Sequence, residues 1–479
     1  MISLLLALAT AGECDVVQPC GTGHAFDLHH NALQDPDCAA LLPIRRLPDA
    51  IPPSLRGVEK RTRDSFATFP NSTETDNFIV KWGVQDRDIS QQNVDSLIAA
   101  LEASWDKYID EWGYTAPNGS DTFKFNVYVG NSGSGAPDDL GAGGYYWTDD
   151  EGYPMVVVSQ DGLSDPGFIG TLAAHEFFHA MQDSNGGFAY DDISGWWWEA
   201  TAMWVQHEVF PEDENWPVFL YWFAIRPQLS VGYFEYPTTG TPEQFHQYGA
   251  FVYVAHLAER HGGPGLVQES FARSFDGDTP MEVLEELITE SGDDIRTSFG
   301  EFVLRNGTWD YPTEDWFEYY IDIYGGYETP QADRISGTVN TQTVNNDNDD
   351  WVAPRGNLPH TFGANYWRFR APPGRFELEF EGESDIQWHV GVATQTGTTH
   401  DTHSVLITDG VGSAEISGLD GVDEAWIVVS PTGTVDDDDG ADYAYEFRVR
   451  TGVCGCDAGS PLSAGWLLVP FLALLRRRR

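Results

Sequence analysis

The hydrophobic pattern of the chain changes from a helical to a strand period near Ala332. From Asp165 to about Tyr320, apolar residues recur almost throughout at the spacing of amphipathic helices. Beyond Ala332 they fall in short β-rich runs between Gly, Asp, Asn and Thr: Tyr366 to Arg370, Arg375 to Phe380, Ile386 to Val392, Ala425 to Val429 and Tyr443 to Val449. This change predicts two regions of different class, the second a β-sandwich over residues 331–450.

Upstream of the helical stretch, strands alternate with one helix. The expected elements are strands at Phe78 to Trp82, Phe123 to Val129, Gly141 to Trp147 and Met155 to Ser159, with a helix from Val94 to Trp112 behind a capping Ser90. Together with the helical stretch, this order predicts a domain over residues 74–330 that holds a mixed sheet and a helical second half. The fold class expected for the chain is therefore α+β, with the β-sandwich following.

Composition excludes several classes of protein. The 479 residues include 75 Asp and Glu against 26 Lys and Arg, and the resulting formal charge of −49 excludes a nucleic-acid binder. No apolar run reaches the roughly 18 residues that span a bilayer as a helix, which excludes a polytopic membrane protein. With 41% apolar and 13% aromatic residues, the chain can build the cores of about two to four domains. We therefore expect an acidic, soluble, multidomain protein.

The N-terminus has the pattern of an export signal. Met1 to Ala11 is a short apolar run that closes on Ala9-Thr10-Ala11, a small-x-small pattern typical of signal-peptidase cleavage. Residues 12–73 are Pro-rich and contain the basic pairs Arg45-Arg46 and Lys60-Arg61. This segment is expected to be a leader or propeptide, and an ordered extension that packs on the next domain is the alternative.

The C-terminus, residues 451–479, has three parts in a fixed order. Cys454-Gly455-Cys456 is followed by a small-residue spacer, the apolar stretch Ala464 to Leu475, and Arg476 to Arg479. This end resembles the MYXO-CTERM sorting tag of myxobacterial surface proteins. The resemblance implies export, processing near the cysteines, and retention at the cell surface or release, so that any membrane anchoring depends on this tag alone.

The other cysteines, Cys14, Cys20 and Cys38, cluster near the N-terminus. An oxidising compartment favours one disulfide among their three pairings. The long middle of the chain contains no cysteine, so neither a Cys-ligated zinc site nor a thiol nucleophile is expected there.

An acidic run, Asp436 to Asp439, is the one candidate calcium site. With Gly440 as the turn glycine of a calcium loop, Asp437, Asp439 and Glu446 fall at ligand positions. The first ligand position is then Val435, and Glu446 lies inside a predicted strand. A solvated acidic loop is therefore favoured over Ca²⁺ binding.

The candidate chemistry lies in the sequence HExxH, formed by His175, Glu176 and His179. Asp165 as a cap and Pro166 in the first turn predict that the motif lies on a helix. Residues at i and i+4 share one helix face, so both histidines can bind one Zn²⁺ ion while Glu176 stands beside the water on the metal.

Hydrolytic zinc sites need a third protein ligand and leave one position open. After His179 the Gly and His of the metzincin spacing are absent, whereas Glu199 stands downstream in Trp196 to Ala202, WWWEATA. The pattern resembles that of the gluzincins, zinc metallopeptidases in which HExxH is followed about twenty residues later by a helix carrying ExxA. Ala202 matches the final alanine, where a small residue lets two helices approach closely. The position at which some gluzincins carry an Asp that supports a zinc-bound His is Met203 here.

The resemblance covers about residues 74–320 and implies a zincin-like fold around an active-site helix. It implies that His175, His179 and Glu199 bind zinc and that Glu176 is the general base. The chain would then be a secreted or surface-anchored zinc endopeptidase, with a protein or peptide as its substrate.

A further hydrogen-bond donor is expected opposite the metal, because hydrolysis of a carbonyl passes through an oxyanion. The sequence Thr241-Pro242-Glu243-Gln244 has the form of a capping box and predicts one helix from there to Gly262. His246 and Tyr248 lie in its first turns, about 200° apart on the helix, so only one can face the cleft. Tyr248 is favoured for its reach and neutral hydroxyl. Gly249 indicates close approach by another element, which we expect to be the active-site helix.

The Gly-rich strand Gly141 to Trp147 is the candidate edge to which an extended substrate adds as a further strand. Two other functions stay open. One is a surface-binding or adhesive protein whose peptidase domain is degenerate and whose β-sandwich holds the partner; the intact Glu176 argues against it. The other is a zinc hydrolase that acts on a non-peptide bond.

Overall fold

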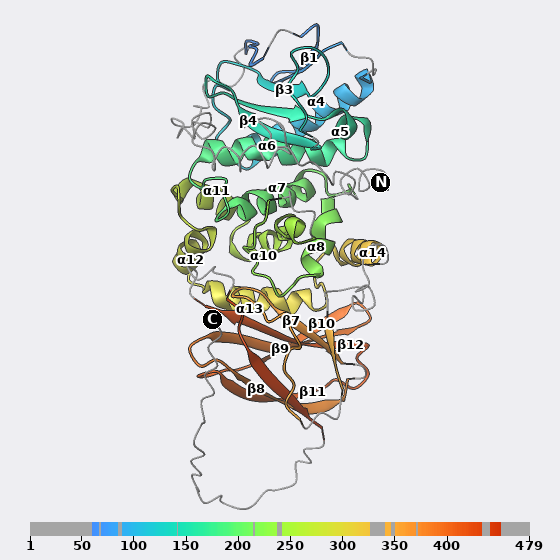
Figure 1. Ribbon diagram of the computed structural model, residues 1–479, viewed down its shortest axis with the longest axis vertical. Helices are drawn as coiled ribbons and strands as arrows, with labels where there is room; N and C mark the ends of the chain where they lie inside the picture. Colours follow the sequence, from blue (N-terminus) through green and yellow to red (C-terminus); the bar gives the residue numbers. More distant parts are fainter. Residues whose placement is uncertain are drawn as a thin grey trace, which may run out of the picture.

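The computed structural model describes residues 60–66, 69–84, 89–140, 142–213, 216–236, 242–325, 341–345, 350–369, 372–433 and 441–451. The chain is α+β, and its elements stack along one long axis (Figure 1). A mixed sheet occupies one end, helices fill the middle, and two further sheets form the other end. The predicted signal peptide, the three N-terminal cysteines, the acidic run at 436–439 and the sorting tag lie outside the described residues.

The first sheet has the strand order β1-β2-β3-β5-β4. Its strands are β1 (Asn71–Glu74), β2 (Phe78–Trp82), β3 (Phe125–Val129), β4 (Gly144–Thr148) and β5 (Pro154–Val158). The three central strands are parallel, whereas β1 and β4 run antiparallel at the two edges. Strands β3 and β5 are buried along their whole length, because a parallel sheet is covered on both faces.

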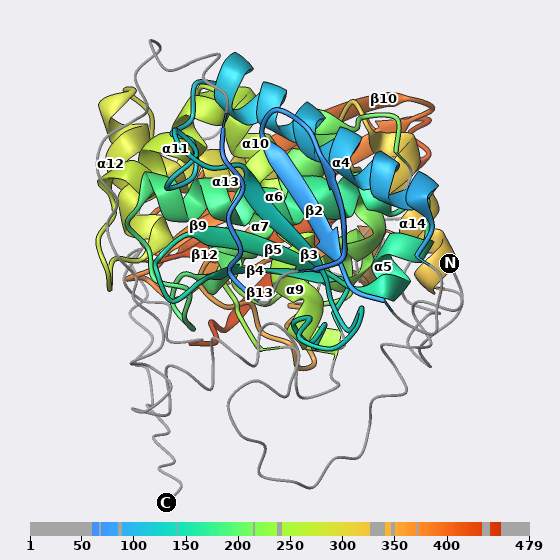
Figure 2. The same cartoon turned by 90° about the horizontal axis from the view of Figure 1, so that it is seen from above.

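Two helices, α4 (Gln91–Trp105) and α6 (Ile169–Asn185), cover one face of this sheet, and Figure 2 shows the strands lying above α6. Aromatic rings fill the interface: the Phe177 ring lies 4.9 Å from that of Phe78 and 5.2 Å from that of Phe125. The sequence predicted the four strands β2 to β5 and helix α4, because each has a clear hydrophobic period.

Residues 60–66 lie against the other face of the sheet and contact it through polar groups that are buried or half-buried. The Lys81 ammonium group donates to Asp64 Oδ1 at 2.6 Å and to Asn126 Oδ1 at 3.0 Å. The Ser65 backbone N–H donates to the Tyr128 hydroxyl at 2.8 Å. These residues and all of strand β1 but Glu74 fall inside the segment 12–73 that the sequence analysis assigned to a leader, and the structure places them on the sheet.

Helices dominate the middle of the molecule. They are α5 (Gln160–Ser164), α6, α7 (Gly195–Val209), α8 (Leu220–Ala224), α9 (His246–Gly249), α10 (Phe251–His261), α11 (Pro264–Arg273), α12 (Pro280–Glu290), α13 (Ile295–Asn306) and α14 (Glu314–Gly325). Short 3-10 helices η3 (Trp216–Phe219) and η4 (Pro242–Phe245) precede α8 and α9. A six-residue π-helix, η2 (Asp106–Glu111), continues α4. Within the described ranges, no helix is long and apolar enough to cross a membrane.

The single helix predicted from Thr241 to Gly262 is wrong, because the described part of this segment divides into η4, α9 and α10. Gly249 lies at the break between α9 and α10. A Cβ atom there would lie 2.6 Å from Phe223 Cβ and 2.7 Å from the Phe219 carbonyl oxygen. The close approach that the glycine permits is therefore to η3 and α8, and not to α6, the helix of the HExxH motif, as expected.

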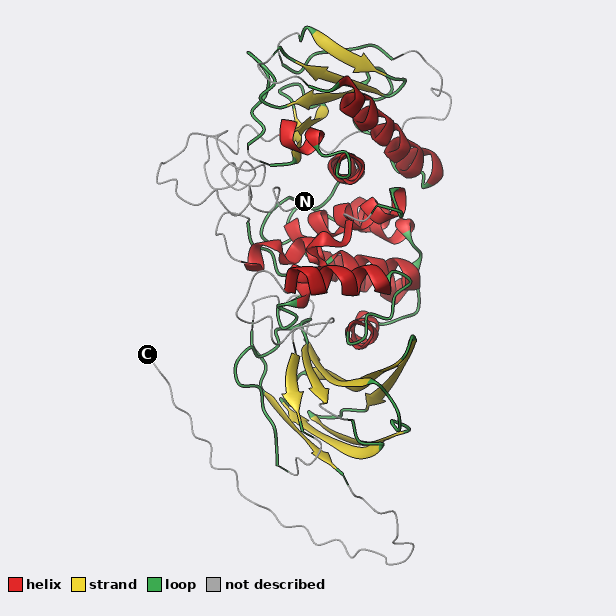
Figure 3. Ribbon diagram, turned by 90° about the vertical axis from the view of Figure 1, so that its right-hand side faces the viewer, coloured by secondary structure: helices red, strands yellow, loops and turns green. Residues whose placement is uncertain are grey.

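The C-terminal region consists of two sheets, with strand orders β10-β9-β12-β7-β6 and β11-β8-β13. The strands are β6 (Thr341–Val344), β7 (Asn365–Phe369), β8 (Arg375–Gly382), β9 (Gln387–Thr396), β10 (Thr399–Val405), β11 (Val411–Ser417), β12 (Glu424–Thr432) and β13 (Tyr445–Arg450). Figure 3 shows the two sheets facing each other, and one buried cluster that includes Trp367, Phe380 and Phe447 lies between them.

The five-stranded sheet also packs on the helices, with α13 against β9 and β12. Trp426 and Phe362 belong to the same buried cluster as the helical core. Backbone hydrogen bonds join the two regions: the Val231 N–H donates to the Phe362 carbonyl and the His360 N–H to the Gln228 carbonyl, both at 2.8 Å. The β-rich region is therefore continuous with the helical core.

This shared core predicts that the helical and β-rich regions unfold together. Trp426→Ala removes a fully buried indole from the shared cluster, and we expect a loss of about 3 to 5 kcal/mol in the free energy of unfolding. Leu406→Ala, at a side chain 85% exposed in the same region, should change it by less than about 0.5 kcal/mol. Urea unfolding followed by tryptophan fluorescence and circular dichroism measures both. Two separate transitions, of which Trp426→Ala shifts only one, would contradict the continuity of the core.

Candidate metal centre

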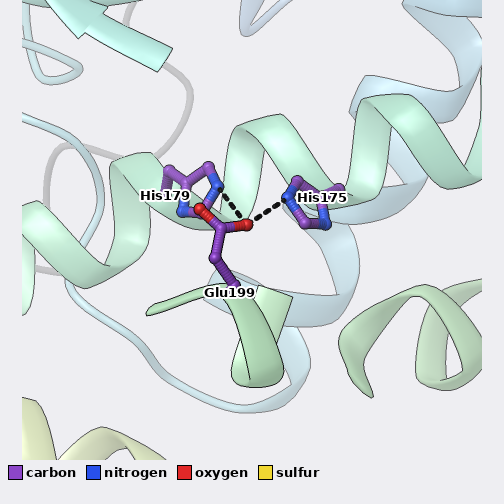
Figure 4. A group of neighbouring side chains, drawn as sticks. All are labelled: His175, His179 and Glu199. Carbon is purple, nitrogen blue, oxygen red and sulfur yellow. Dashed lines mark ion pairs between the residues drawn. The ribbon is translucent and has the colours of Figure 1, made fainter. Parts of the chain in front are cut away.

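Three ligand atoms converge between α6 and α7. His175 and His179 lie one turn apart on α6, and Glu199 approaches them from α7 (Figure 4). Glu199 Oε2 lies 3.3 Å from His175 Nε2 and 3.9 Å from His179 Nε2. Ligand atoms of the three residues all lie within 4.8 Å of one another, and all three residues are buried. This group could hold a metal ion, as the spacing in the sequence predicts for these three residues.

Helix α6 begins later in the chain than the sequence predicted. The helix begins at Ile169, one turn after the expected cap. Asp165 Oδ1 accepts the Gly167 N–H at 3.0 Å, and the Asp165 carbonyl accepts the Ile169 N–H at 3.2 Å. Asp165 and Pro166 thus form a capped turn that leads into the helix. The two histidines keep their common face, because the i and i+4 relation does not depend on where the helix starts.

One oxygen of the Glu199 carboxylate is buried without a donor. Oε1 accepts a hydrogen bond from the Tyr190 hydroxyl at 2.7 Å. Oε2, which faces both imidazoles, has no hydrogen-bond partner among the described residues. Burial raises the pKa of Glu199 to about 7. A buried carboxylate oxygen is costly unless something compensates its charge, so a cation between the three side chains fits these residues.

Both imidazoles are neutral at pH 7. Burial lowers the pKa of His175 to about 3 and that of His179 to about 4. Neutral imidazole is the form that binds a metal ion. His179 Nδ1 lies 2.6 Å from Gln182 Oε1, and His175 Nδ1 lies 3.0 Å from the Gln206 side-chain nitrogen. Each histidine therefore has a side-chain amide beside Nδ1, whereas Met203 offers no carboxylate.

Glu176 lies beside the ligands and faces the edge strand β4. A Cβ atom added to Gly144 would lie 3.0 Å from Glu176 Cγ, so the strand passes directly over this side chain. Burial, and then the negative charge of Glu199, raise the pKa of Glu176 well above its usual range. The carboxylate is therefore a strong proton acceptor when it is ionised.

A second contact ties β4 to α6. The Tyr146 hydroxyl donates to Asp183 Oδ2 at 2.7 Å, and burial raises the pKa of Asp183 to about 6. Gly144 and Tyr146 are two positions apart on the strand, so both face the helix. The edge strand is thus fixed along α6 on the side of Glu176.

The structure places Tyr248, and not His246, against His175 of the candidate metal centre. The Tyr248 ring stacks on that of His175, with 6.4 Å between centroids and 28° between planes. The pKa of Tyr248 is raised well above its usual range, first by burial and then by the charges of Glu199 and Glu176. His246 instead packs against Phe223 on α8, with 4.8 Å between ring centroids. Burial lowers the pKa of His246 to about 3, so it is also neutral.

Sequence reasoning missed three residues that contact the ligands: Tyr190, Gln182 and Gln206. Only Gln182 carries a local signal, because it follows His179 at the i+3 position of the same helix. The roles of Tyr190 and Gln206 depend on how α7 crosses α6, which no spacing in the sequence reveals.

The donor set predicts that one divalent ion binds per chain and stabilises the fold. Zinc at a free concentration 100-fold above its Kd should add about 2.7 kcal/mol to the free energy of unfolding. Glu199→Gln removes the charge that faces both imidazoles and should abolish most of this gain, whereas His403→Ala on β10 should leave it unchanged. Isothermal titration calorimetry measures zinc binding, and thermal unfolding with and without Zn²⁺ measures the gain in stability. Equal stabilisation of the wild type and Glu199→Gln would place the ion elsewhere.

A comparison with known protein families identifies the family of this chain. The model of DUF6055, a family of unknown function, matches residues 47–452. The match spans the first sheet, the helices and both C-terminal sheets, including every residue of the candidate metal centre. No curated protein matches the chain. The chain belongs to the DUF6055 family.

Proposed function

We propose that this protein is a zinc-dependent endopeptidase of gluzincin type with a zincin-like catalytic region. The observation that carries the proposal is the convergence of His175, His179 and Glu199 around one point, with Glu176 beside them under an edge strand. Three ligands and an adjacent carboxylate are the parts that a hydrolytic zinc site requires. The donor set, two neutral imidazoles and one carboxylate, suits Zn²⁺.

A zinc ion held by these ligands would supply Lewis-acid chemistry, polarising the substrate carbonyl and acidifying water. Glu176 takes a proton from the attacking water at its carboxylate as the water oxygen bonds to the carbonyl carbon. It then gives this proton to the amide nitrogen as the C–N bond breaks, so that an acid and an amine leave. Burial and the charge of Glu199 raise its pKa, which favours the uptake of the proton.

Tyr248 is the donor that we assign to the oxyanion. Its ring stacks on His175, and its raised pKa keeps the hydroxyl protonated at neutral pH. A neutral O–H aimed at developing negative charge lowers the barrier because it needs no rearrangement during the reaction. His246 packs against Phe223 on another side of its helix, and it is not part of this proposal.

Strand β4 is the proposed binding edge for the substrate. It lies at the end of the sheet, paired with β5 on one side. An extended peptide can add to such an edge through backbone hydrogen bonds. Because Gly144 lies directly over Glu176, a peptide bond held along β4 would pass close to the general base. We further propose, from the signal-peptide and sorting-tag patterns of the sequence, that the enzyme acts outside the cytoplasm or at the cell surface.

Glu176→Gln separates metal binding from catalysis. The amide cannot take up a proton, so cleavage of a fluorescent casein should fall by at least about 100-fold. Zinc content should stay at that of the wild type, because Glu176 is not a ligand. Glu290→Gln, at the C-terminal end of α12, is the matched control and should keep full activity. A fully active Glu176→Gln variant would refute the mechanism, and an inactive wild type loaded with zinc would favour the adhesive or non-peptide alternative.

Tyr248→Phe tests the oxyanion donor. Loss of the hydroxyl should lower kcat by about 100-fold with little change in KM, because the donor acts on charge that develops in the transition state. Zinc affinity and melting temperature should stay near those of the wild type. Unchanged kcat in Tyr248→Phe, together with a large loss in a folded, zinc-loaded His246→Ala variant, would transfer the role to His246.

A further inference from the structure

A single buried amide, that of Gln182, connects the two helices that carry the metal ligands. The side chain is 1% exposed. Its Oε1 lies 2.6 Å from His179 Nδ1 on its own helix, α6. Its Nε2 donates to the Trp198 carbonyl at 2.8 Å and to Thr201 Oγ1 at 2.7 Å, both on α7. The two α7 partners flank Glu199, so one amide contacts the surroundings of two ligands.

The chemistry of its partners fixes which way this amide points. The Trp198 carbonyl can only accept a hydrogen bond. Thr201 Oγ1 donates its one hydrogen to the Trp197 carbonyl at 2.7 Å, so it accepts from Gln182. Both α7 partners therefore require N–H groups. The reversed amide would set two carbonyl-type oxygens against each other at the 2.8 Å contact with Trp198.

The fixed amide in turn determines the tautomer of His179. Gln182 Oε1 can only accept, so the hydrogen of the neutral imidazole must lie on His179 Nδ1. The lone pair then lies on Nε2, the atom that faces Glu199 Oε2. His179 is thus held in the tautomer and orientation that binds a metal ion.

The contacts of His175 differ in kind. Gln206 Nε2 lies 3.0 Å from His175 Nδ1 and 3.0 Å from Met203 Sδ, a weak acceptor. The His175 ring also lies beside the Ala202 backbone, which a side-chain substitution does not remove. Gln206 is therefore a control of the same residue type, on the same pair of helices, beside the other histidine.

We propose that Gln182 is a positioning residue that locks the metal centre: it fixes the His179 tautomer and holds α7, with Glu199, against α6. The inference rests on the metal site of the proposed function. It assigns to a neutral amide the part that a carboxylate often plays beside a zinc-bound histidine. Both halves of the amide are needed, the oxygen toward His179 and the nitrogen toward α7.

The test is the zinc dissociation constant of the full-length protein, measured by competition with a chromophoric chelator. Gln182→Met keeps the length of the side chain but loses all three hydrogen bonds, and zinc affinity should fall by about 10- to 100-fold. Gln182→Glu keeps an acceptor for His179 but cannot donate to α7, so its affinity should fall as well. Gln206→Met should lose much less than Gln182→Met.

A second pair of variants acts on the same hydrogen bond from α7. Thr201→Val removes the acceptor for Gln182 and should weaken zinc binding, whereas Thr201→Ser keeps the hydroxyl and should bind as the wild type does. Circular dichroism and thermal unfolding of each metal-free variant show whether it is folded. The comparison of Thr201→Val with Thr201→Ser therefore tests the positioning role of Gln182 even if Gln182→Met does not fold.

Wild-type zinc affinity in a folded Gln182→Met variant would overturn the proposal, and so would equal affinities of Thr201→Val and Thr201→Ser. Undiminished affinity in Gln182→Glu would overturn the link to α7. Casein cleavage by the wild type is measured in parallel. A wild-type protein that binds zinc without cleaving casein would refute the proposed peptidase activity but not the positioning role of Gln182. Unchanged zinc affinity in the Gln182 variants of an active enzyme would refute the role of Gln182 alone.

Discussion

The packing of α7 on α6 places the Glu199 carboxylate, with no exposed surface, 3.3 and 3.9 Å from two imidazole nitrogens. Three buried polar groups at these distances are stable together only when their charges and lone pairs are compensated. Tyr190 supplies one donor and leaves Oε2 facing the histidines. A metal ion is a partner that all three side chains could share.

Contacts elsewhere in the fold hold α6 and the surroundings of Glu199 in position. Phe177 fixes α6 to the sheet, and the Phe234 ring packs edge-on against Tyr190 at 5.9 Å, behind Glu199. The segment that carries Phe234 also contains Val231, whose N–H bonds to Phe362 of the β-rich region. The β-rich region thus belongs to the core that holds the ligands, rather than to a separate module on a linker.

The convergence of His175, His179 and Glu199 could be predicted because its determinants are local or carried by a motif. His175 and His179 need only the period of a helix, and Glu199 followed from the resemblance to gluzincin spacing. The choice between Tyr248 and His246 was open in the sequence, since it depends on where α9 breaks from α10 at Gly249 and on tertiary contacts with α8. The amide network of Gln182 and strand β1, which has a weak hydrophobic pattern, likewise depend on neighbours distant in sequence.

X-ray absorption at the zinc edge of the full-length protein is the most direct measurement of the metal centre. We expect one zinc per chain with two histidine nitrogens at about 2.0–2.1 Å, carboxylate oxygen at about 2.0–2.2 Å, and a further light-atom position for water. His179→Ala should lower the histidine contribution by one ring. A spectrum without histidine scattering, with sulfur ligands, or unchanged in His179→Ala would contradict zinc binding by these three residues.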